Sequence, residues 1–124
     1  MKQILAIAAG GGLGSVLRFW MSGWVSNMLG RGFPYGTLVV NVSGSLLMGF
    51  LYVLLVDKFN ASAEWRAVLL IGLLGGFTTF SSFSMETFQL LEAGEIVRAF
   101  MNIVLSVAVC VAATWLGVIV ARQL

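Results

Sequence analysis

Apolar residues fill four long stretches of the chain, and short polar segments separate them. The stretches cover residues 4–28, 37–56, 65–91 and 97–121. Each has roughly 20 to 28 residues, and a helix of that length crosses the hydrocarbon core of a bilayer at about 1.5 Å of rise per residue. The pattern therefore predicts four transmembrane helices. Because the connections are short, consecutive helices are expected to be antiparallel neighbours.

The composition supports a membrane protein. Of the 124 residues, 60% are hydrophobic and only 10% are charged, which leaves too little polar surface to cover a soluble domain. The sequence has no internal repeat and no linker, so residues 1–124 are expected to form a single four-helix transmembrane domain. Four helices offer little interior in which to bury polar side chains, and oligomerisation is expected for that reason.

The least common residue types exclude several kinds of chemistry. The chain has no histidine and a single cysteine, Cys110, which excludes intrachain disulfides, Cys/His metal sites and histidine-based acid–base catalysis. The net charge of +2 comes from scattered basic residues without a cluster, and nothing indicates a nucleic-acid partner. No catalytic pair of side chains is visible, so an enzyme is not expected.

The third apolar stretch is interrupted by the sequence GGFTTFSSFS at residues 75–84. Lipid offers no hydrogen bonds, so these hydroxyl side chains must face protein, an ion or water. Two adjacent glycines, Gly75 and Gly76, weaken a helix, and a helix broken at mid-membrane presents free N–H and C=O groups that bind ions. The pattern predicts a break in the third helix and a permeation or ion site.

Neutral polar side chains also recur at helical spacing in three of the predicted helices. The second carries Thr37, Asn41, Ser45 and Gly49, and the fourth carries Asn102, Ser106, Cys110 and Thr114. In the third, Thr78, Ser81, Ser84 and Thr87 recur beside Phe77, Phe80 and Phe83. For a single hydroxyl, helix–helix adhesion worth about 0.6 to 2 kcal/mol is the commoner interpretation. Asn41 differs, because a buried amide is costly and brings two donors, and there a functional role is favoured.

A lining of neutral donors is what a small, strongly hydrated anion needs in place of its water. The electropositive edges of the Phe80 and Phe83 rings can add to this lining, although ordinary packing is the alternative interpretation. Arg18 lies deep in the first predicted helix, where it either reaches the interface beside the tryptophans or attracts anions. Glu86 is either an interfacial carboxylate or a polar group at a pore mouth.

Three motifs give the chain a resemblance to a known family. They are GGGLGSVLR at residues 10–18, PYGTLVVN at 34–41 and GGFTTFSSFSME at 75–86, and the last is the most specific. Together they resemble the Fluc (CrcB) family of fluoride channels along essentially the whole chain. The resemblance implies an all-α membrane protein with four transmembrane helices, a break in the third, and an antiparallel, dual-topology homodimer with two separate fluoride pores.

The resemblance also assigns roles to individual residues. It implies a fluoride pore lined by Asn41, Phe80, Phe83, Ser81, Ser82, Ser84, Thr37 and Ser106. It places Arg18 and Glu86 at a vestibule or pore mouth, and a structural Na⁺ at the dimer interface on the backbone carbonyls of Gly75 and Thr78. Ser82 stands where threonine is usual, which keeps the hydroxyl. Asn102 stands where some members have tyrosine, so its role in the polar track is left open.

The expected function is a passive, fluoride-selective channel of a bacterial-type inner (plasma) membrane, which lets cytoplasmic F⁻ leave and so reduces fluoride toxicity. A small dual-topology multidrug exporter is one alternative, but it needs a carboxylate in the first helix, where Arg18 is the only charge at depth. A non-transporting scaffold subunit is another, and it would give the polar break no purpose.

The basic residues are only weakly biased toward one of the two expected sides of the membrane. One side carries Lys2, Lys58, Arg66 and Arg122, and the other carries Arg31, Arg98 and, depending on its depth, Arg18. Because the Lys/Arg count of short loops sets orientation, this weak bias predicts insertion in both orientations.

Overall fold

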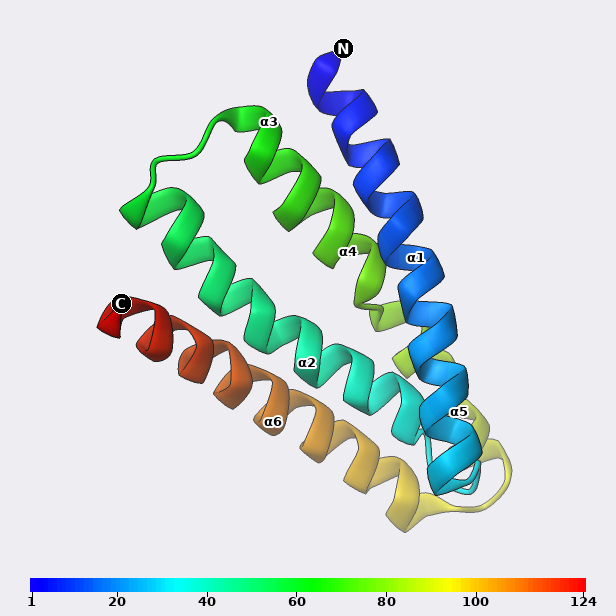
Figure 1. The fold of residues 1–124 in the computed structure, drawn as a ribbon. Helices are drawn as coiled ribbons and strands as arrows, with labels where there is room; N and C mark the ends of the chain where they lie inside the picture. Colours follow the sequence, from blue (N-terminus) through cyan, green and yellow to red (C-terminus); the bar gives the residue numbers. More distant parts are fainter.

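The computed structural model describes all 124 residues, and every regular element in it is a helix (Figure 1). The helices form four apolar spans long enough to cross a membrane: Lys2–Leu29, Tyr35–Lys58, Ala63–Glu92 and Ile96–Gln123. The prediction of four membrane-length helices is confirmed, with ends that differ by at most two residues from the predicted ones.

Two of the spans are single helices and two are composite. The first and last are α1 (Lys2–Leu29) and α6 (Ile96–Gln123). The second consists of α2 (Tyr35–Tyr52) and the π-helical segment η1 (Val53–Lys58). The third consists of α3 (Ala63–Arg66), the π-helical segment η2 (Ala67–Leu73), α4 (Leu74–Phe77) and α5 (Phe80–Glu92).

The helices pack in two pairs. α2 lies along α6, while α1 lies along the third span, mainly against η2 and α4. Figure 1 shows both chain ends and the connection before α3 at one end of the bundle, and the other two connections at the opposite end. Each pair therefore joins spans that run in the same direction.

Glycines bring the paired helices into backbone contact. A Cβ built on Gly10 of α1 would collide with the carbonyl oxygen of Val68 in the third span, and one built on Gly14 would collide with that of Leu73. In lipid there is no hydrophobic force between helices, so close approach at small residues supplies much of the attraction. This contact holds α4 against α1 one turn before Arg18.

The third span is not helical throughout. Helical structure stops at Phe77 and resumes at Phe80, and the two residues between are extended: Thr78 at φ −85°, ψ 158° and Thr79 at φ −152°, ψ 121°. The glycine pattern predicted the break at Gly75–Thr78; Thr78 is part of the interruption, but the glycine part of this placement is wrong, because Gly75 and Gly76 both lie within α4. Gly76 instead serves packing, since a Cβ there would lie 2.6 Å from the carbonyl oxygen of Gly11.

Candidate functional site

The Asn41 side chain of α2 binds both backbone groups of Thr79. Its Nδ2 donates to the Thr79 carbonyl at 2.9 Å, and the Thr79 N–H donates to Asn41 Oδ1 at 2.8 Å. In an unbroken helix that N–H would donate to the carbonyl of Gly75 four residues earlier. A buried backbone group left without a partner costs about 1–3 kcal/mol, so the amide stabilises the interruption. One Nδ2 proton of Asn41 stays outside this pairing.

The Arg18 side chain binds the other side of the interruption. Its Nε donates to the carbonyl oxygen of Gly76 at 3.0 Å. The half-buried guanidinium therefore lies against the end of α4 rather than at the end of α1. Since one guanidinium N–H is engaged, the terminal NH₂ groups remain to face a neighbouring cavity.

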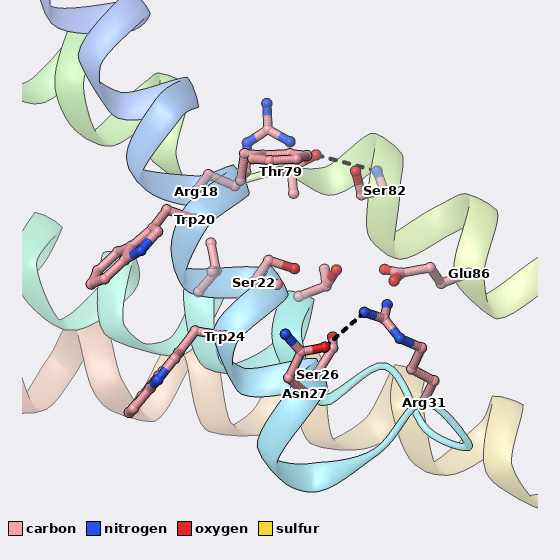
Figure 2. A pocket seen from close by; sticks show the side chains of 14 residues that line it. Arg18, Trp20, Ser22, Trp24, Ser26, Asn27, Arg31, Thr79, Ser82 and Glu86 are labelled. Carbon is pink, nitrogen blue, oxygen red and sulfur yellow. Dashed lines mark hydrogen bonds between the residues drawn. The ribbon is translucent and has the colours of Figure 1, made fainter.

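That cavity, here called the arginine hollow, has a volume of about 580 Å³. Its polar lining is Arg18, Ser22, Ser26, Asn27, Arg31, Thr37, Thr79, Ser82 and Glu86. Figure 2 shows Arg18 and Thr79 at one end and Arg31 at the other, where the Arg31 Nη2 donates to Asn27 Oδ1 at 3.1 Å. Two guanidinium groups against one carboxylate give the hollow a positive balance, which attracts anions.

Glu86 supplies the only carboxylate of the arginine hollow. Its Oε1 is enclosed and has no hydrogen-bond partner within the chain. An enclosed oxygen of this kind is costly unless water or another polar group reaches it from the hollow.

A second cavity, here called the phenyl hollow, has a volume of about 380 Å³. Its lining includes Asn41, Ser45, Thr78, Thr79, Phe80, Phe83, Ser106 and Thr114. The rings of Phe80 and Phe83 lie with centroids 5.3 Å apart and planes tilted by 51°. Phe80 is 77% exposed whereas Phe83 is 8% exposed, so the Phe80 ring projects from the bundle.

A buried hydrogen-bond network joins α6 to α5 beside the phenyl hollow. Ser106 Oγ donates to Asn102 Oδ1 at 3.4 Å, Asn102 Nδ2 donates to Thr87 Oγ1 at 2.8 Å, and Thr87 donates to the Phe83 carbonyl at 2.7 Å. Asn102 is 2% exposed and lines neither hollow. In this chain Asn102 ties the helix that carries Phe83 to α6.

The structure brings most of the sequence-predicted residues into the two hollows. The arginine hollow contains Arg18, Thr37, Ser82 and Glu86, and the phenyl hollow contains Asn41, Thr78, Phe80, Phe83 and Ser106. Three others, Gly75, Ser81 and Ser84, are exposed and line neither hollow.

Several lining residues were not predicted from the sequence. Ser22, Ser26, Asn27 and Arg31 belong to the end of α1 and the following loop, and Thr79 belongs to the interruption. Thr79 carried a usable signal, because a threonine directly before a helix is a common N-cap. Its Oγ1 accepts the N–H of Ser82 at 3.2 Å.

Comparison with known proteins gives consistent matches along the chain. The family model described as "CrcB-like protein, Camphor Resistance (CrcB)" matches residues 5–118. A protein of Coxiella burnetii is 50% identical to this chain, over 98% of this chain and 99% of its own length. A protein of Geobacter metallireducens is 51% identical to this chain, over the full length of both. A Methylococcus capsulatus protein is 51% identical over 98% of this chain, which spans about half (54%) of that relative. Each of the three is named "Fluoride-specific ion channel FluC".

Proposed function

The chain belongs to the CrcB family, and we infer from this membership that it is a fluoride-specific ion channel rather than an enzyme. The observation that carries the inference is identity of about half over nearly the full length to proteins named for that function. A multidrug exporter would need a carboxylate in the first helix, but Lys2 and Arg18 are the only charged residues of α1. The scaffold alternative leaves two hollows, each with polar side chains in its lining and each between membrane spans, without a role.

A passive path suits the chemistry of fluoride. Hydrogen fluoride is a weak acid that crosses bilayers uncharged and releases F⁻ at neutral pH. A channel in the inner (plasma) membrane lets the trapped anion leave down its electrochemical gradient, which protects the cell.

In the proposed pore, neutral donors replace the water of the ion. The free Nδ2 proton of Asn41 and the edges of Phe80 and Phe83 serve in the phenyl hollow, together with Ser106. Thr37 and Ser82 serve in the arginine hollow, and Arg18 with Arg31 concentrates anions there. In each hollow the donors assigned to it already line one cavity.

We propose that the working unit is an antiparallel, dual-topology homodimer. Ser81 and Ser84 are exposed in one copy, and lipid would offer their hydroxyls no hydrogen bond beyond the contact of Ser81 with Thr79. The exposed Phe80 ring lies on the same helix, so a second copy placed over this face would bring all three into an enclosed path. Weakly biased basic residues support insertion in both orientations.

A structural Na⁺ between the two copies fits the residues at the interruption. Asn41 accepts the Thr79 N–H, which in an unbroken helix would donate to the Gly75 carbonyl. Gly75 is also exposed, and only one atom lies within 4 Å of a Cβ built on it. Two carbonyls from each copy, those of Gly75 and Thr78, would provide oxygen ligands for a hard cation. Bound there, Na⁺ would balance carbonyl dipoles that face each other across the interface.

Fluoride efflux from liposomes tests the proposed function. Purified protein is reconstituted with internal potassium fluoride, and valinomycin releases the potassium while a fluoride electrode records the external anion. The proposal predicts fast fluoride release, and negligible chloride release from matched chloride-loaded vesicles recorded with a chloride electrode. Fluoride release no faster than from protein-free vesicles would reject it.

A further inference from the structure

We propose that Thr79 is a pore residue, and that the fluoride ion passes over its side chain between the arginine hollow and the phenyl hollow. The proposal rests on the channel function inferred above. Thr79 is the only residue that lines both hollows, so they adjoin at its position. An ion that uses both hollows must therefore pass this side chain.

The backbone at this position is held from two sides. Asn41 binds both the N–H and the carbonyl of Thr79, and Arg18 binds the carbonyl of Gly76 three residues earlier. Since the backbone is fixed, the Thr79 side chain is the part that meets a passing ion. Asn41 thus also acts as a positioning residue for Thr79.

The hydroxyl of Thr79 has a proton to offer. Its oxygen accepts the N–H of Ser82 at 3.2 Å, as Figure 2 shows, and lies 3.3 Å from Ser81 Oγ. A hydroxyl that accepts one hydrogen bond keeps its own O–H for donation, here to Ser81 or to an anion. A donor at the junction replaces water that the ion loses there, and lost hydration without a replacement hydrogen bond is costly.

The competing interpretation is that Thr79 only caps α5. Caps and pore residues respond differently to charge, because aspartate and asparagine both cap helices at least as well as threonine. Thr79→Asn keeps the cap and a neutral donor, whereas Thr79→Asp keeps the cap but adds a negative charge at the junction. The two variants therefore separate the roles.

We expect Thr79→Asn to retain fluoride efflux within about tenfold of the unsubstituted protein, and Thr79→Asp to lose roughly 100-fold or more through like-charge repulsion. Ser62, which caps α3 in an exposed loop by accepting the N–H of Trp65, provides the matched control. Ser62→Asp should leave efflux unchanged. Equal efflux from Thr79→Asp and Thr79→Asn would overturn the proposal, whereas absent efflux from the unsubstituted protein would instead reject the channel function.

If Thr79→Asp does not fold, chemical modification of a cysteine at position 79 tests the same proposal. Thr79→Cys is made in a Cys110→Ser background, folded and reconstituted, and then treated with a methanethiosulfonate that carries either a sulfonate or only a methyl group. The sulfonate should block efflux at least tenfold more than the methyl group, relative to the treated background. Equal effects of the two reagents would overturn the proposal.

Discussion

Replacing Asn41 with aspartate changes one group at the centre of the proposed pore. The new carboxylate would keep an acceptor for the Thr79 N–H but lose the donor to the Thr79 carbonyl, now 2.9 Å from Asn41 Nδ2. Leaving that carbonyl unpaired costs about 1–3 kcal/mol of folding free energy. A carboxylate about 4 Å from a passing fluoride ion repels it by about 4 kcal/mol at an effective dielectric constant of ~20. That repulsion corresponds to a loss of roughly a thousandfold in flux.

The assay combines fluoride efflux from liposomes with thermal unfolding and size-exclusion chromatography of the same preparation. Asn41→Asp should unfold at a lower temperature and show near-background efflux while it remains a folded dimer. Asn60→Asp is the matched control, because Asn60 lies in a loop, and its Oδ1 accepts from Arg66 in a way that aspartate preserves. Undiminished efflux from a folded Asn41→Asp dimer would refute the assignment of Asn41 to the pore.

Three other predictions concern the rings, the cation and the orientation. Phe80→Ala should lower fluoride efflux while leaving the packing within one copy intact, because Phe80 is 77% exposed there, whereas Phe83→Ala should lower both efflux and the unfolding temperature; unchanged efflux in both variants would remove the ring edges from the path. Replacing Na⁺ with a bulky organic cation should reduce efflux or dissociate the dimer, and sodium-independent activity and assembly would contradict the cation site. Adding two or three lysines to the loop that contains Arg31 should force one orientation and abolish efflux, and coexpression of a copy biased toward the opposite orientation should restore efflux. Orientation is measured by cysteine accessibility, and full activity from a uniformly oriented population would exclude the antiparallel dimer.

The four spans were predictable because length and apolar composition alone define them. The residues that meet in the hollows were partly predictable as well, since Asn41 and Ser45 share a helix face at a spacing of four and both line the phenyl hollow. The place where the third span leaves the helix was not predictable from local propensity. It depends on Asn41, which lies 38 positions from Thr79, and on Arg18, which lies 58 positions from Gly76.

The polar residues of the third span show the same limit. A spacing of three suggested one common hydroxyl face, yet Thr87 is buried in a network with Asn102 while Ser81 and Ser84 are exposed. Ser81, Ser84 and Thr87 all lie in α5, and a step of three residues falls short of a full helical turn by about 60°, so Ser81 and Thr87 point about 120° apart. Burial by a second copy is equally invisible to a pattern read within a single chain.

The central claim is a passive conduit selective for fluoride, and the reversal potential of the current in a planar bilayer tests it most directly. With a tenfold fluoride gradient and an opposing chloride gradient, the current should reverse at the equilibrium potential of fluoride and ignore chloride. A reversal potential that follows chloride or protons, or the absence of any current from protein that is folded and inserted, would contradict the account.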